Sequence, residues 1–250
     1  MKLAYTIEGI PGTPALVLSP SLGTTTSLWE AHEGLLATHF RLIRHDHPGH
    51  GHSHAPDGPV TVESIGRGVL EILDELHVER ASFCGVSLGG MVGLWLGANA
   101  PERIDRLVLV ATGAKLGTPE TYAERAELVR REGTAAVVPG ARERWFTEAF
   151  RDSEAATAIL GELADVSPEG YAACCDAVGA WDFRAELGGV AAPTLVVAGA
   201  EDPIVTPAVC EALVEGIPDA RLVVVPDAAH LVNVEQPEAF ATAMLAHLER

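Results

Sequence analysis

Six short apolar runs, separated by helical patterns, constrain the fold of this chain more than any other feature. Each run is rich in Val and Leu and bounded by Gly or Pro, which predicts a strand. The runs are Ala15–Ser19, Leu42–Arg44, Ala81–Gly85, Ile104–Ala111, Thr194–Gly199 and Arg221–Val225. Their apolarity is nearly continuous, which indicates parallel strands covered on both faces. The alternation of strands and helices predicts an α/β fold with a mostly parallel central sheet flanked by helices.

Helical patterns fill the spaces between these runs. One apolar stripe at helical spacing consists of Val62, Ile65, Val69, Ile72, Leu73 and Leu76, and a second helix begins near Pro237. From about Gly117 to Gly189 the pattern is helical, with no convincing strand. We therefore predict a core of residues 1–116 and 190–250, with a helical lid inserted at 117–189.

Length, charge and cysteine usage exclude several classes of protein. The 250 residues can bury one large core, and no run of eighteen apolar residues could span a bilayer. A net charge of −18 makes nucleic acid a poor partner. Neither a signal-peptide pattern near Met1 nor C-x-x-C spacing is present, so we expect a cytoplasmic protein with reduced cysteines. Assembly into a homo-oligomer is left open.

The pentapeptide Gly85-Val86-Ser87-Leu88-Gly89 is the strongest chemical signal. It follows a strand-like run and precedes a buried helical pattern that extends to Asn99. A serine at the apex of a strand-turn-helix has a strained backbone that only small neighbours tolerate, and its hydroxyl stands above the sheet. We expect Ser87 to be a nucleophile.

A serine nucleophile needs a base, and the base needs an acid that orients it. His230 follows the last predicted strand through a short turn, which places it over the same sheet edge as Ser87. Asp202 lies just beyond the run Thr194–Gly199 and is the expected acid. Two rivals are Glu201, which is expected to point away, and Asp227, for which a turn-capping role is favoured.

An oxyanion hole requires two backbone N–H groups near the reacting carbonyl. Leu88, directly after the nucleophile, is expected to supply one of them. Leu22, in the loop after the first predicted parallel strand, is expected to supply the other, while Gly23 allows close approach. Pro20 has no N–H to donate.

Five histidines between His45 and His54 raise the question of a metal site. The H-x-H pairs lack a following Asp-His, and no distant second set of ligands is obvious. We interpret the stretch as a Gly-rich loop that is held by Asp46 and bends beside the active site. No metal and no cofactor are therefore expected.

At these residues the sequence resembles the α/β-hydrolase superfamily over nearly its whole length, including the chain order Ser, Asp, His. Within it, four segments resemble the 3-oxoadipate enol-lactonases of aromatic-compound degradation. These are Ser21–Thr24, Arg144–Thr147 with Ala149-Phe150, Gly170–Cys175 and Trp181–Arg184. The chain departs from that family's pattern at Pro20 and Gly179, where Asn and Arg are common.

The resemblance implies an α/β-hydrolase fold and hydrolysis of a small, carboxylate-bearing enol-lactone to the 3-oxo dicarboxylic acid through an acyl-enzyme. A substrate carboxylate implies an arginine partner, for which Arg144 and Arg184 are the candidates. Trp145 is expected to form part of the wall of the substrate pocket.

Other functions share parts of this pattern. A general carboxylesterase or perhydrolase would use the same triad and differ in the lid. A non-catalytic receptor could keep the triad and only bind a small ligand. Dehalogenases and epoxide hydrolases of this fold use Asp at the nucleophile position, where this chain has Ser87.

Overall fold

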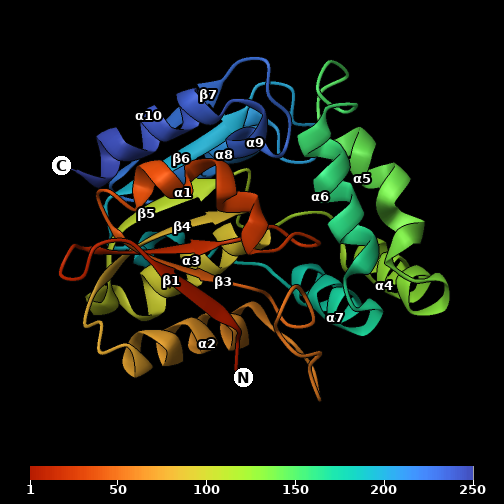
Figure 1. Cartoon of the computed structure of the whole chain (residues 1–250), viewed down its shortest axis with the longest axis horizontal. Coiled ribbons are helices and arrows are strands. Elements are labelled where there is room, and N and C mark those ends of the chain that lie inside the picture. Colours follow the sequence, from red (N-terminus) through yellow and green to blue (C-terminus); the bar gives the residue numbers. More distant parts are fainter. Residues whose placement is uncertain (250) are drawn as a thin grey trace.

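A seven-stranded sheet runs through the centre of the protein, whose computed structural model describes residues 1–249 (Figure 1). The strands are β1 (Tyr5–Glu8), β2 (Ala15–Ser19), β3 (Arg41–His45), β4 (Ala81–Val86), β5 (Ile104–Val110), β6 (Thr194–Gly199) and β7 (Ala220–Val225). They lie in the order β1-β3-β2-β4-β5-β6-β7. Every neighbouring pair is parallel except β1 with β3. The prediction of a mostly parallel sheet is confirmed.

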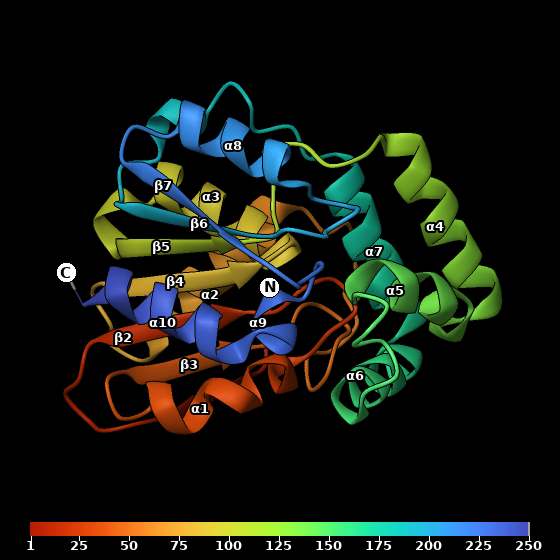
Figure 2. The ribbon, with the colours of Figure 1, turned by 90° about the horizontal axis from the view of Figure 1, so that it is seen from above.

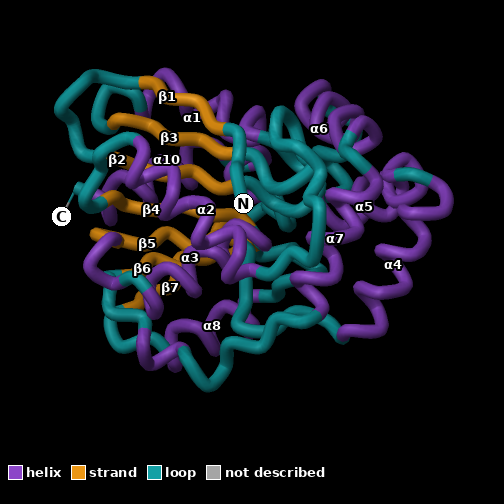
Figure 3. The backbone as a smooth tube through the Cα atoms, turned by 90° about the horizontal axis from the view of Figure 1, so that it is seen from below, coloured by secondary structure: helices purple, strands orange, loops and turns teal. Residues whose placement is uncertain are grey.

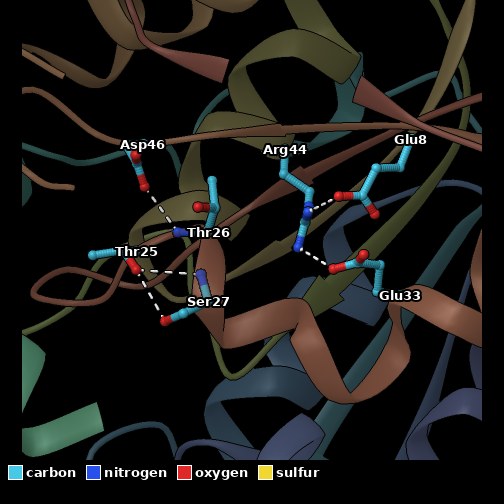
Figure 4. Close-up of polar contacts among 7 residues, drawn as sticks. All are labelled: Glu8, Thr25, Thr26, Ser27, Glu33, Arg44 and Asp46. Atoms are coloured by element: carbon cyan, nitrogen blue, oxygen red, sulfur yellow. Dashed lines mark hydrogen bonds and ion pairs between the residues drawn. The ribbon is translucent and has the colours of Figure 1, made fainter. Parts of the chain in front are cut away.

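The apolarity of the strands follows their position in the sheet. Every residue of β2, β4 and β6 is buried, because helices cover both faces of the sheet (Figure 2). The edge strands β1 and β7 keep partly exposed residues, and β1 was not among the six apolar runs. A buried guanidinium helps to hold β1 in place: Arg44 of β3 forms ion pairs with Glu8 of β1 and with Glu33 (Figure 4).

Two pairs of helices flank the sheet. Helices α1 and α10 contact each other on one face, and α2 and α3 contact each other on the opposite face (Figures 1 and 2). The bounds of the helices of the α/β part are α1 (Glu30–Leu36), α2 (Val62–Glu75), α3 (Leu88–Asn99), α8 (Pro207–Gly216), α9 (Val232–Glu235) and α10 (Pro237–Leu248). Short 3₁₀ turns add η1 (Thr26–Trp29), η2 (Pro101–Arg103) and η4 (Leu187–Gly189).

Local sequence explains where these helices begin. Thr61 caps α2, because its side chain accepts from the Ser64 N–H while the Ser64 hydroxyl accepts from the Thr61 N–H. The predicted stripe is buried from Val62 to Leu73 and partly buried at Leu76, and α2 packs against α3. Pro237 occupies the first turn of α10, where its missing N–H costs no hydrogen bond.

A group of helices lies beyond one end of the sheet (right in Figure 1). It comprises α4 (Pro119–Glu132), η3 (Thr134–Val137), α5 (Val138–Trp145), α6 (Glu154–Asp165) and α7 (Pro168–Gly179). No strand occurs between residues 117 and 189, all of which are described (Figure 3). The lid role of this segment, with the bounds 117–189, stays a prediction.

The helical segment is tied to loops at the carboxyl ends of the strands. The Ser167 N–H donates to the Gly49 carbonyl (3.1 Å), and the Leu231 N–H donates to the Trp145 carbonyl (3.1 Å). Glu162 of α6 accepts hydrogen bonds from the hydroxyl groups of Thr25, which caps η1, and of Ser27 within η1. Within residues 1–249, no helix is both long and apolar enough to cross a membrane.

Candidate active site

Ser87 stands at the apex of the turn between β4 and α3. Its φ of 53° and ψ of −110° lie in a region that non-glycine residues rarely occupy. The Ser87 N–H donates to the Val110 carbonyl (2.8 Å), and the Thr112 hydroxyl donates to the Ser87 carbonyl (2.8 Å). The two glycines make the turn sterically feasible: a Cβ on Gly85 would lie 2.2 Å from the Gly89 oxygen. Surrounding backbone contacts thus hold the serine in its strained conformation.

His230 and Asp202 form a buried pair. His230 Nδ1 lies 2.8 Å from Asp202 Oδ2, and the two residues are 2% and 3% exposed. The other carboxylate oxygen, Oδ1, accepts from the N–H groups of Ile204 (2.7 Å) and Val205 (2.9 Å). Because the carboxylate can only accept, Nδ1 carries the proton, and Nε2 is left free to act as a base.

The two rival acids lie elsewhere. Glu201 is exposed, and its backbone N–H donates to the Ala228 carbonyl. Asp227 is exposed in a turn at φ 51°, and its carbonyl accepts from the Gln236 side chain. Of these three carboxylates, only that of Asp202 is hydrogen-bonded to the imidazole.

Ser87 and His230 line one small pocket together with residues of the helical segment. The pocket has a volume of about 60 Å³. Its lining consists of Ser21, Leu22, Ser87, Tyr122, Arg125, Ala141, Arg144, Trp145, Tyr171, Val178, Ile204 and His230. A larger hollow, of about 470 Å³ between His77 and Arg103, contains no hydroxyl nucleophile and is open to solvent. The chemistry therefore points to the smaller pocket.

No hydrogen bond between the Ser87 hydroxyl and His230 is present among residues 1–249. Nucleophile–base contacts are often long before a substrate binds and then tighten. Since both side chains border the same small pocket, a substrate carbonyl placed there lies next to both.

Of the two expected oxyanion donors, Leu22 lines the pocket, and Leu88 directly follows Ser87 in the chain. Leu88 begins α3, where the N–H groups of the first turn have no intrahelical acceptor. Leu22 lines the pocket from a tight turn, which is closed by the Thr24 N–H donating to the Ser21 carbonyl (3.1 Å). Gly23 adopts φ 85° in this turn, a conformation that favours glycine.

Two guanidinium groups face the pocket without a carboxylate partner. Neither Arg125 of α4 nor Arg144 of α5 forms an ion pair within residues 1–249. Arg144 is half-buried, and burial together with the charge of Arg125 lowers the pKa of its guanidinium. Arg125 also lies over the ring of Tyr122, 5.1 Å from its centroid. Two cations without an acidic partner in one pocket could hold an anion.

Arg125 was missed in the sequence analysis. One signal was available in the sequence. Tyr122, Ala126 and Val129 form the buried stripe of α4, and Arg125 lies three residues after Tyr122, beside that stripe. Nothing in the local sequence distinguishes this arginine from Arg130 and Arg131 of the same helix, which form ion pairs with acidic residues.

The structure does not place Arg184, the other candidate for the substrate carboxylate, beside the pocket. Its side chain is 67% exposed, forms an ion pair with Asp182 at 2.7 Å and does not line the pocket. It follows the end of α7, and a neighbouring carboxylate satisfies its charge. Trp145, in contrast, is buried and contributes to the pocket wall, with Arg144 beside it.

The histidine-rich stretch forms a loop that is bound to its own backbone and to the oxyanion loop. As expected, Asp46 holds this loop: its carboxylate accepts from the N–H groups of Thr26 (2.8 Å; Figure 4) and His52 (2.9 Å). The imidazoles of His47 and His50 bond to backbone atoms of Pro20 and Gly23. No cluster of three potential metal-binding side chains occurs in the part of the chain that the structure describes.

The four cysteines are free and buried. Burial raises the pKa of Cys175 and Cys210 to about 12, so these thiols stay protonated at neutral pH. A cysteine nucleophile does not fit this environment.

Known proteins share this fold and sequence. The model of the alpha/beta hydrolase family matches residues 16–243. A 3-oxoadipate enol-lactonase of Acinetobacter baylyi is 40% identical over 252 residues, which cover all of this chain and 94% of that protein. The crystal structure of the enol-lactonase from Burkholderia xenovorans LB400 superposes with a TM-score of 0.96 at 39% identity, covering 99% of this chain and 96% of the other.

An esterase from Thermogutta terrifontis, whose structure was determined with malate bound, is more distant. It is 30% identical, has a TM-score of 0.92 and covers 99% of this chain and 93% of its own. These relatives share the whole length of the chain, including the helical segment. The chain belongs to the alpha/beta hydrolase family.

Proposed function

We propose that this protein hydrolyses 3-oxoadipate enol-lactone, with Ser87, His230 and Asp202 as its catalytic triad. The observation that carries the proposal is the pocket itself, where a triad-like set meets Arg125 and Arg144, two cations without an acidic partner. In a chain with 35 acidic and 17 basic residues, unpaired guanidiniums beside a nucleophile indicate an anionic substrate. The enol-lactonase relatives suggest which anion it is.

The first half of the reaction opens the lactone ring. His230 Nε2 takes the Ser87 hydroxyl proton, and Oγ attacks the lactone carbonyl. The carbonyl oxygen becomes negative and accepts hydrogen bonds from the N–H groups of Leu22 and Leu88. The ring C–O bond then breaks, and the His230 imidazolium gives its proton to the released enolate, which becomes a ketone within the acyl-enzyme and leaves Nε2 free again.

The second half releases the product. Water loses a proton to His230 Nε2 and attacks the ester carbonyl of the acyl-enzyme. When the bond to Ser87 Oγ breaks, the imidazolium returns its proton to the serine. The product is a 3-oxo dicarboxylate. Throughout, Asp202 keeps the imidazole in the Nδ1–H tautomer and stabilises its charged form.

The helical segment supplies substrate recognition in this proposal. Arg125 from α4 and Arg144 from α5 hold the substrate carboxylate, and Trp145 closes the apolar side of the pocket. Residues 117–189 therefore act as the lid that was predicted from the sequence. The cytoplasmic location and the assembly into homo-oligomers stay predictions.

The decisive experiment is turnover of the lactone itself. Purified protein is added to enzymatically generated enol-lactone, and the loss of its ultraviolet absorbance is followed beside simple aryl esters. We expect efficient lactone hydrolysis, its abolition by a serine-directed fluorophosphonate, and no hydrolysis by Ser87→Ala. Failure to consume the lactone would refute the proposed substrate.

A general carboxylesterase is the second candidate, and the similarity to the Thermogutta esterase favours it. It predicts fast hydrolysis of neutral aryl esters and no preference for the lactone. A receptor that only binds small ligands predicts no turnover of either substrate.

A further inference from the structure

The histidine-rich loop contains a buried imidazole that the mechanism above does not use. His50 is fully buried, and its Nε2 accepts from the Gly23 N–H at 3.0 Å. Its Nδ1 lies 2.9 Å from the Pro48 carbonyl oxygen. An N–H can only donate and a carbonyl can only accept, so His50 is neutral with its proton on Nδ1. Burial lowers the pKa of His50 to about 4, which keeps this form at neutral pH.

The partner of His50 belongs to the turn that contains the oxyanion donor. Residues Ser21 to Thr24 form this turn, with Gly23 in its third position at φ 85°. A positive φ at that position is typical of a type II turn. Type I and type II turns differ mainly in the orientation of their central peptide group, which here joins Leu22 to Gly23. The hydrogen bond to His50 therefore selects one of two orientations of the peptide next to the Leu22 N–H.

Other contacts hold the ends of the same loop but not its central peptide. The Thr24 hydroxyl bonds to the backbone of Ser21 in both directions, at 3.0 Å each. His47 Nε2 lies 2.8 Å from the Pro20 carbonyl oxygen. A Cβ on Gly89 would lie 2.7 Å from that same oxygen, so the loop packs directly on the nucleophile turn. A displacement of the loop would therefore change its position relative to the nucleophile turn.

We propose that His50 is a positioning residue of the oxyanion hole, which accepts the Gly23 N–H and so orients the Leu22 N–H toward the reacting carbonyl. The inference rests on the proposed function, in which Leu22 and Leu88 stabilise the oxyanion. His50 does not line the pocket, so it acts on the substrate only through the loop.

The test compares two replacements of His50 with a matched replacement of His45. His50→Phe keeps a planar ring and removes the acceptor, whereas the longer amide of His50→Gln places an oxygen near the position of Nε2. His45→Phe is the control, because His45 is equally buried and neither of its ring nitrogens has a hydrogen-bond partner among the described residues. Burial lowers the pKa of both imidazoles to about 4.

Removing one oxyanion donor costs about a hundred- to a thousandfold in kcat, so a misaligned donor should cost about ten- to a hundredfold. We expect that loss in kcat for aryl ester hydrolysis by His50→Phe, with KM changed less than about twofold. An arylboronic acid, whose tetrahedral adduct places an oxygen in the hole, should bind the variant weaker by a similar factor. His50→Gln should recover most of kcat, and His45→Phe should stay within about twofold of the wild type.

Three results would overturn the inference: wild-type kcat in His50→Phe, an equal loss in His50→Gln and His50→Phe, or an equal loss in His45→Phe. If His50→Phe does not fold, His50→Asn replaces it, since its shorter side chain mimics Nδ1 and should be slower than His50→Gln. Turnover that survives Ser87→Ala would instead refute the proposed function. Normal turnover by His50→Phe beside an inactive Ser87→Ala would refute the His50 inference alone.

Discussion

Replacing Arg144 with alanine removes half of the cationic pair that we assign to the substrate carboxylate. The side chain is half-buried and has no carboxylate partner of its own within residues 1–249, so its charge is available to a ligand. A charge-assisted hydrogen bond contributes about 1.5–3 kcal/mol. Because about 1.4 kcal/mol corresponds to a tenfold change, kcat/KM for the enol-lactone should fall roughly ten- to a hundredfold.

The assay measures kcat/KM on two substrates for each variant. A neutral aryl ester still uses Ser87, His230 and the backbone donors, so Arg144→Ala should change its hydrolysis by less than about twofold. Arg125→Ala should show the same selectivity for the lactone. Arg184→Ala is the matched control: its guanidinium is exposed and paired with Asp182, so neither substrate should be affected.

The reasoning would be refuted if Arg144→Ala lost equally on both substrates, or on neither. An equal loss would indicate a structural role in α5, and no loss would mean that the carboxylate binds elsewhere. A lactone-specific loss in Arg184→Ala would contradict the placement of that side chain outside the pocket.

The remaining predictions concern the triad, pH and metals. We expect nearly equal losses of kcat in Ser87→Ala, His230→Ala and the double variant, because the two groups act as a unit. Asp202→Asn should lose less. Additive losses in the double variant would contradict this expectation. His45 and His50 have folded-state pKa values lowered to about 4 and unfolded values near 6.5, so the unfolded chain binds more protons between these values. Each should contribute about 3 kcal/mol of stability that is present above pH 6.5 and lost as pH falls to 4. Urea unfolding at several pH values should show this slope, and His45→Gln should reduce it. Chelators should leave turnover unchanged. Stoichiometrically bound metal whose content follows the activity would refute the expectation that the enzyme needs no metal.

Much of the fold could be predicted because its signals are local. Strands that are buried on both faces must be apolar throughout, so β2 and β6 were predicted with the bounds that the structure shows. The edge strand β1 was not among the six predicted strands, since a strand at the edge of a sheet does not need to be apolar throughout. The turn at Ser87 was predictable for a different reason: its geometry tolerates so few residue types that the glycines reveal it.

The pairing of His230 with Asp202 was expected from the chain order, but proximity in sequence could not exclude Asp227. The structure separates the two carboxylates, because Asp227 lies in an exposed left-handed turn while Asp202 receives two backbone hydrogen bonds under the imidazole. Three-dimensional contacts thus decided between residues that are chemically alike.

By itself, the sequence determined the type of sheet, the position of the nucleophile turn and the residues available for a triad. Each of these depends on neighbours along the chain. Only the tertiary structure decided that Arg125 faces the pocket while Arg184 faces solvent, and that His50 reaches Gly23 across 27 positions. The direction of a surface guanidinium or a buried imidazole depends on how helices and loops pack against one another. No repeating pattern of residues in the sequence predicts that packing.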